Sequence, residues 1–372
     1  NIERVRAACE ERGLELVPAV FSIGYGGWAL AHDRHLAEGL PVRDARRVAR
    51  GADIRWEADD PPSLCNADFE EHARHRFPGF VFIDQPGVIS FADTTTVHSG
   101  RTSLRLEHFT AHSAGNARAM QEVRVRPWRC YRFSTWVRLE NVQPSDAFRM
   151  LALAGGRSLA PREFRFTGTQ EWTRISLLFN SMEFDTVRLY AGVWGGRAGR
   201  VWLDDWSLEE VGPAQVVRRS GTPVTLRSED GAAEYELGRD FVVPDDPQFS
   251  PYRADRPPLV FRRPDGSRIR DGERLRAGWY HPVVIHESQI TVCMAEPALY
   301  EHAAEEAERL ARIVRPRRVL LSMDEVRMGG TCRACEGRDM AHVLGQCAAR
   351  LGAALRRHLP DVELYIWSDM FD

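Results

Sequence analysis

The stretch VLLSMDEVR, residues 319–327, is the main evidence in the sequence for the fold of the two ends of the chain. It begins with a short apolar run and ends with two adjacent carboxylates, Asp324 and Glu325. Residues 297–314 and 340–355, on either side, have an amphipathic helical pattern. An apolar strand that ends in acids between two helices is typical of a parallel α/β sheet, where chemistry gathers at the carboxyl ends of the strands.

The adjacent carboxylates have a chemical use in such a position. At the end of a strand both side chains can reach one cleft, where each makes ionisation of the other more costly. One carboxyl group can then stay protonated near neutral pH and act as a general acid. The alternative is that both side chains are solvated residues of a surface loop.

Size and composition limit the function classes. A chain of 372 residues is long enough for two or three domains, and 43% hydrophobic and 28% charged residues are ordinary for a globular protein. A net charge of −3 gives no reason to expect nucleic acid or an anionic membrane as partner. No apolar run approaches the ~20 residues that span a bilayer. Oligomeric state and localisation stay open, with a periplasmic or secreted protein expected if a signal peptide was removed.

The middle of the chain has a different character. From about residue 77 to residue 211, short β-rich runs alternate with turn signals, which is typical of an all-β sandwich. The fold class predicted is therefore α/β plus all-β, a partial (β/α)8 barrel interrupted by a β-sandwich. The expected parts are residues 1–70, the first part of the barrel; 71–212, the inserted sandwich; 213–272, a β-rich return segment; and 273–372, the truncated continuation of the barrel.

Three segments of the middle region resemble a known class of modules. They are HSGRTSLRLE (98–107), VRPWRCYRFSTWVRLEN (125–141) and GRVWLDDWSLEE (199–210). Their order is similar to that in the jelly-roll carbohydrate-binding modules appended to polysaccharide-degrading enzymes. The resemblance implies sugar binding by exposed aromatic rings, and a structural calcium held by Asp204 or Asp205. The alternative is a module that has lost sugar binding and acts as a spacer.

The aromatic candidates in this region are tryptophans. Because most tryptophans are core residues, we expect only one or two of them to be exposed. The six candidates are Trp128, Trp136, Trp172, Trp194, Trp202 and Trp206.

The α/β segments resemble the catalytic barrel of family 20 glycoside hydrolases, the β-N-acetylhexosaminidases. The segments concerned are LELVPAV (14–20), EPALYEHAAEEAERLARIVRPRRVLLSMDEVR (296–327) and YIWSDMF (365–371). The resemblance implies that Glu325 protonates the leaving glycosidic oxygen. It also implies that Asp324 orients a substrate 2-acetamido group, which acts as internal nucleophile. If no acetamide is present, a second carboxylate is needed, for which Asp369 is the candidate.

The same resemblance implies a carbohydrate substrate and no required cofactor. Aromatic walls and polar groups around the acids would bind the sugar. The expected substrate-binding residues are Trp279, Tyr280, His281, Trp367, Tyr25 and Arg327.

Seven scattered cysteines make no disulfide framework. Cys332 and Cys335 form a CxxC pair, and zinc binding there would need two more ligands, from His342, Cys347 or Cys293. The alternative is that these are buried or reduced thiols.

Two other functions stay open besides a glycoside hydrolase. One is a non-catalytic carbohydrate-binding protein whose degenerate barrel is a scaffold. The other is a metal-dependent enzyme that uses His281, His286 and the acids.

Overall fold

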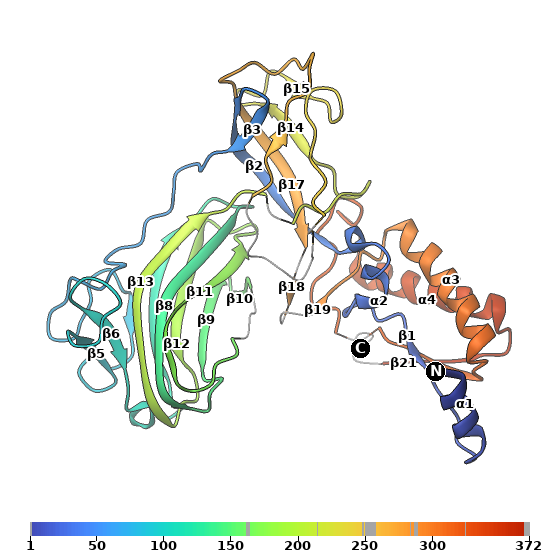
Figure 1. Cartoon of the computed structure of the whole chain (residues 1–372), viewed down its shortest axis with the longest axis horizontal. Helices are drawn as coiled ribbons and strands as arrows, with labels where there is room; N and C mark the ends of the chain where they lie inside the picture. Colours follow the sequence, from blue (N-terminus) through green and yellow to red (C-terminus); the bar gives the residue numbers. More distant parts are fainter. Residues whose placement is uncertain are drawn as a thin grey trace.

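The computed structural model of the protein describes residues 2–160, 164–213, 215–247, 249, 258–282, 284–285, 289–323 and 325–367. Figure 1 shows that they form three parts. A β-sandwich lies on one side and an α/β unit with two long helices on the other, and a six-stranded sheet lies above and between them. We call this last part the connecting sheet.

The sandwich consists of two five-stranded antiparallel sheets, of the jelly-roll type, and the sequence prediction of a β-sandwich is confirmed. Alternate residues such as Phe133 and Val137 face Leu189 and Ala191 of the opposite sheet in one buried core. The β8 sheet has the order β11 (Gln170–Asn180), β8 (Cys130–Gln143), β13 (Ala198–Glu210), β6 (Ser103–Leu106), β5 (Ser90–Asp93). The β12 sheet has the order β10 (Arg157–Ser158), β9 (Phe148–Ala154), β12 (Thr186–Val193), β7 (Ala117–Arg124), β4 (Phe82–Ile83).

The connecting sheet joins segments that precede and follow the sandwich in sequence. Its order is β15 (Glu234–Tyr235), β14 (Thr225–Ser228), β17 (Arg274–Pro282), β2 (Gly39–Arg50), β3 (Asp53–Trp56), β16 (Phe261–Arg262). Strands β2 and β17 are antiparallel, with Leu275 opposite Arg47 and His281 opposite Leu40. The sequence assigns residues 273–372 to a parallel barrel, but β17 in this segment is antiparallel to both of its neighbours. Its alternation, with Leu275, Ala277 and Trp279 buried on one face, is that of a sheet with one covered side.

The α/β unit contains the parallel strands β1 (Ala19–Val20), β20 (Arg318–Leu321) and β21 (Glu363–Ile366), in that order. Helices α3 (Pro297–Ile313) and α4 (Met340–His358) pack on each other and share one buried core with β20. The helices and the strands predicted around the acidic pair are confirmed. Shorter elements complete the unit: α1 (Ile2–Glu10), α2 (Gly27–Leu30), η1 (Arg34–Leu36), β18 (Val284–Ile285) and β19 (Gln289–Ile290). A further turn, η2 (Phe109–Ala111), belongs to the sandwich.

The described residues do not form a barrel. The three parallel strands make an open sheet with β1 and β21 at its edges. In LELVPAV, residues 14–20, which the resemblance assigns to the barrel, the strand is only the two residues of β1. Leu14 and Val17 are exposed, and only Ala19 and Val20 pair with β20. None of the helices described is long and apolar enough to cross a membrane.

Candidate functional site

The expected general acid lies just beyond the carboxyl end of β20. Glu325 has a left-handed backbone, with φ 51°, and its carbonyl oxygen accepts a hydrogen bond from Gln289 Nε2 at 2.6 Å. Its carboxylate accepts hydrogen bonds from Arg327 Nη2, at 2.8 Å, and from the Tyr25 hydroxyl group. The structure therefore brings together Glu325, Arg327 and Tyr25, which the sequence placed in one site.

The surroundings of this cluster are open to solvent. The side chains of Glu325 and Arg327 are 35% and 49% exposed. Tyr25 also lines an apolar depression of about 450 Å³, which continues between β1 and α3. Trp367, at the end of β21, is 51% exposed, and its contact with sugar stays a prediction. The other two expected acids, Asp324 and Asp369, lie outside the described residues, as does His286.

The residues of β17 do not form the expected sugar-binding wall. Trp279 is 1% exposed in the core of the connecting sheet, so its prediction as a stacking surface is wrong. Tyr280 is half-buried against Cys293, Cys332 and Cys335. His281 contacts the sandwich, where its Nε2 lies 3.2 Å from Asn180 Nδ2. Strand alternation places Tyr280 on the opposite face of β17 from Trp279 and His281, so the three side chains do not form one wall.

The two expected calcium ligands contact the loop at His98. Asp204 is buried and accepts hydrogen bonds from the backbone N–H groups of His98, at 2.9 Å, and Ser99, at 3.2 Å. Burial raises the pKa of Asp204 to about 6. Asp205 accepts a hydrogen bond from Ser99 Oγ at 2.9 Å, and its Oδ2 lies 2.6 Å from His98 Nδ1. The carboxylates thus fasten this loop to β13, and calcium binding by them stays a prediction.

On the outer face of the β8 sheet, Trp202 is buried, and one face of the partly exposed Trp136 is covered by His98. Trp202 is 3% exposed and donates from Nε1 to Asp93 Oδ2 at 3.0 Å, and the Arg138 guanidinium lies 5.2 Å from its ring. Trp136 is stacked on His98 with 3.8 Å between ring centroids. A depression of about 580 Å³ lies beside Trp136 and Trp206, with further walls from Asp68, Glu71, Arg174 and Asp205.

The outer face of the β12 sheet is different. The strand registers place Tyr190 opposite both Leu151 and Met120, and Met120 opposite Phe82. We call Phe82 and Tyr190, together with Trp194, the aromatic row. Trp194 follows β12, and its ring centroid lies 6.4 Å from that of Tyr190, with an interplanar angle of 59°. Both rings are partly exposed, and neither has a stacked partner in the described part of the chain.

Charged groups flank the aromatic row. The Arg118 guanidinium lies 5.3 Å from the Phe82 ring and 6.0 Å from the Trp194 ring. Its Nε donates to Asp84 Oδ2 at 2.8 Å, which fixes the plane of the guanidinium. Between Arg118 and Arg149 the register places Gly192, where a Cβ atom would lie 2.2 Å from the carbonyl oxygen of Ala117. Gly192 itself therefore places no side chain between the two arginines.

Sequence reasoning named Trp194 as a candidate but missed Tyr190, Arg118 and Asp84. Alternation along β7 and β12 indicates which residues point away from the core. It does not indicate which of the two outer faces keeps its rings accessible, because that depends on cross-strand neighbours such as Arg138 and His98 on the other sheet.

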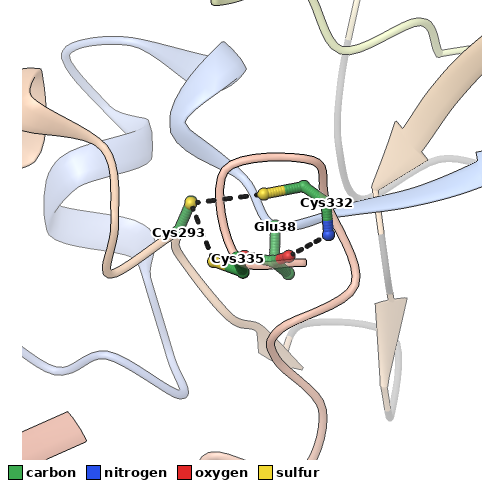
Figure 2. A group of neighbouring side chains, drawn as sticks. All are labelled: Glu38, Cys293, Cys332 and Cys335. Carbon is green, nitrogen blue, oxygen red and sulfur yellow. Dashed lines mark hydrogen bonds between the residues drawn. The ribbon is translucent and has the colours of Figure 1, made fainter. Parts of the chain in front are cut away.

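A second cluster lies between the connecting sheet and the α/β unit, and Figure 2 shows its four side chains, Glu38, Cys293, Cys332 and Cys335. Cys293 Sγ lies 3.6 Å from Cys332 Sγ and 3.7 Å from Cys335 Sγ, so the thiols are not joined by disulfides. All four residues are at most 1% exposed, and burial raises the pKa of Glu38 to about 7.

Within the described residues, no other group of three or more histidine, cysteine or acidic side chains has its ligand atoms within 4.8 Å of one another. Of the further zinc ligands considered from sequence, the structure thus brings Cys293 to the CxxC pair, and it leaves out His342 and Cys347. Glu38 was not expected, since it lies more than 250 residues away in sequence and no spacing pattern indicates it.

No family model matches the sequence, and neither does any curated protein. Among solved structures, the CBM22-1 xylan-binding domain of Paenibacillus barcinonensis Xyn10C is 16% identical, with a TM-score of 0.30, and the match covers 43% of this chain and 100% of that one. TmCBM61 in complex with beta-1,4-galactotriose is 18% identical, with a TM-score of 0.30, over 40% of this chain and 97% of that one. A Stig cyclase, Fisc, from Fischerella sp. TAU is 16% identical, with a TM-score of 0.31, over 40% and 96%. Similarity at this level assigns no function.

Proposed function

We propose that the sandwich binds a glycan on the outer face of the β12 sheet, with Tyr190 and Trp194 as stacking surfaces. Sugar rings present flat C–H faces and a rim of hydroxyl groups. The main support is the cross-strand register, which places partly exposed rings beside a fixed guanidinium. The apolar faces of the rings would contact the sugar, and charged groups at the edge would bind its hydroxyls.

Arg118, held by Asp84, would orient the sugar through hydrogen bonds to its hydroxyl groups. The hydrogen bonds between Arg118 and Asp84, from Nε to Oδ2 at 2.8 Å and from Nη2 to Oδ1 at 3.4 Å, hold the guanidinium in one plane. A planar group that is already oriented loses little entropy on binding a hydroxyl pair. Gly192 lies between Arg118 and Arg149 in the strand register and places no side chain of its own between them.

The outer face of the β8 sheet supports this proposal less well. Its Trp202 is buried and its Trp136 is already stacked on His98, so neither offers two free ring faces. The depression beside Trp136 is lined by four charged side chains as well as by Trp136 and Trp206, and Trp206 is only 3% exposed.

The test is calorimetric titration of the full chain with soluble xylan and β-1,4-galactan, which are chosen because the two modules named above bind xylan and a galactotriose. Truncating one stacking ring costs about 1–2 kcal/mol, so Tyr190→Ala and Trp194→Ala are each expected to weaken binding about 5- to 30-fold. Trp136→Ala is the matched control and is expected to bind as the unmodified chain does. Loss of binding in Trp136→Ala alone would assign the glycan to the other sheet.

A glycoside hydrolase is the second candidate. The observation that favours it is the meeting of Glu325, Arg327 and Tyr25 at the carboxyl ends of parallel strands. In this proposal Glu325 protonates the glycosidic oxygen and Arg327 orients the substrate. The test is hydrolysis of aryl β-glycosides, with Glu325→Gln expected to lower kcat at least about 100-fold. Turnover that is equal in the two proteins would remove Glu325 from the mechanism.

A further inference from the structure

We propose that Cys293, Cys332, Cys335 and Glu38 bind one Zn²⁺ ion in a closed structural site. The four ligands belong to three segments: the residue before β2, the turn before α3, and the loop after β20 (Figure 2). A thiolate-rich set with one carboxylate suits zinc, which accepts sulfur and oxygen ligands in a tetrahedron.

The distances between the sulfur atoms fit this geometry. Zinc–sulfur bonds of about 2.3 Å at tetrahedral angles place two sulfurs about 3.8 Å apart. The separations from Cys293 Sγ are 3.6 Å to Cys332 Sγ and 3.7 Å to Cys335 Sγ. A ligand oxygen of Glu38 lies within 4.8 Å of all three sulfurs, so the ion needs only small shifts of the side chains.

Hydrogen bonds hold Glu38 in position for this role. Its Oε1 accepts from the backbone N–H groups of Thr331, at 3.0 Å, and Cys332, at 2.8 Å, and lies 3.2 Å from Thr331 Oγ1. Oε2 then remains as the oxygen for the metal. Partners that orient a ligating carboxylate in this way are typical of metal sites.

The charge balance also indicates a cation. A buried carboxylate among three thiols is costly unless a positive charge compensates it. The buried Arg219 lies 3.7 Å from Cys332 Sγ, but it is shared with Glu296, at 3.6 Å, and with the carbonyl oxygens of His35 and Ala37. A dication at the centre of the cluster would compensate much of the charge of the carboxylate and of the thiolates that form on metal binding, and Arg219 would add one further positive charge.

The proposed role is structural, because all four ligands are buried and leave no open coordination position. Glu38 directly precedes β2, and the Thr331 hydroxyl donates to the carbonyl oxygen of Gly39 at 2.8 Å. The ion would therefore fasten the connecting sheet to the α/β unit, whose segments are far apart in sequence.

The test measures metal in the full chain, purified under reducing conditions without chelator. Elemental analysis is expected to find about one zinc per chain. In competition with a chromogenic chelator, Cys335→Ser and Glu38→Gln are expected to bind zinc at least about 10-fold more weakly. Cys347→Ser, a buried cysteine of α4 outside the cluster, is the matched control and is expected to keep its zinc.

A second measurement avoids variants that fail to fold. The unmodified chain, loaded with Co²⁺ in place of zinc, is expected to show thiolate-to-cobalt charge-transfer absorption, which three neutral thiols cannot produce. Absence of both zinc and this absorption in the folded chain would overturn the proposal. So would a disulfide between any two of Cys293, Cys332 and Cys335 in the protein kept under reducing conditions.

Discussion

Protonation of His281 is expected to destabilise the contact between the connecting sheet and the sandwich. Nδ1 lies 3.1 Å from the carbonyl oxygen of Pro282, which makes it the N–H donor, and Nε2 then accepts from Asn180 Nδ2 at 3.2 Å. The Asn180 amide cannot turn to accept instead, because its Oδ1 already accepts from the Met182 N–H at 2.8 Å. A protonated imidazole would thus direct a donor at a donor.

The sign and size of the effect follow from the pKa. Burial lowers the pKa of His281 from 6.5 to about 4. His281 therefore binds a proton below about pH 6.5 in the unfolded chain, but only below about pH 4 in the native chain. The free energy of unfolding falls as the pH drops through this interval. At about 1.4 kcal/mol per pH unit the full effect is about 3 kcal/mol, and we expect about 1–2 kcal/mol because part of the residue is accessible to solvent.

The assay is urea unfolding, followed by tryptophan fluorescence at about pH 7 and about pH 4.5. In His281→Gln the amide oxygen can accept from Asn180 without titrating, so the loss of stability between the two pH values is expected to shrink by this amount. The control is His72→Gln, an exposed histidine, which is expected to keep the loss of the unmodified chain. An equal loss in His281→Gln and the unmodified chain would show that protonation of His281 does not cause it.

Three further substitutions test the packing of the sheets. Asp59→Asn removes a buried charge that pairs with Arg276 and three further arginines, and it is expected to lower the free energy of unfolding by about 3 kcal/mol; a change below about 1 kcal/mol would contradict this. Gly192→Ala brings a Cβ to 2.2 Å from the Ala117 carbonyl oxygen and is expected to lower the thermal midpoint by several degrees, while an unchanged midpoint would show that the strands can separate. Arg47→Met replaces a fully buried guanidinium that has one hydrogen bond and no carboxylate partner in the described residues; urea unfolding is expected to show equal or greater stability, and a loss above about 2 kcal/mol would contradict this.

The parts of the fold that depend on local periodicity could be predicted from sequence. The alternation of Tyr131, Phe133 and Val137 in β8, and the helical spacing of α3 and α4, indicate elements that the structure contains. These patterns are visible because one face of each element is buried against a single core.

The connecting sheet could not be predicted in the same way. The sequence of β2, GLPVRDARRVAR, is rich in arginine and reads as irregular, yet Arg47 is fully buried with its guanidinium 3.5 Å from the Phe261 ring. Its partner β17 lies more than 220 residues further along the chain, so neither the pairing nor the register is indicated locally. This pairing also explains why Trp279 faces a core instead of a sugar.

In the candidate sites, too, sequence patterns indicate some residues and only tertiary contacts reveal the others. The CxxC pair and Trp194 are visible as residue types, but Glu38 and Tyr190 become part of a site only through tertiary contacts. Neither a spacing rule nor an alternation pattern connects them to their partners, because sheets and loops bring together segments that are separate in sequence.

The most direct test of the central claim, glycan binding on the aromatic row, is one calorimetric comparison of the unmodified chain with a Tyr190→Ala/Trp194→Ala double variant, titrated with soluble xylan and β-1,4-galactan. We predict measurable heat of binding for the unmodified chain with at least one of the two glycans. For the double variant we predict a loss of about 30-fold or more in affinity, with an unchanged thermal midpoint. Equal affinity in the two proteins, or no binding of either glycan by the unmodified chain, would show that the aromatic row does not bind these glycans.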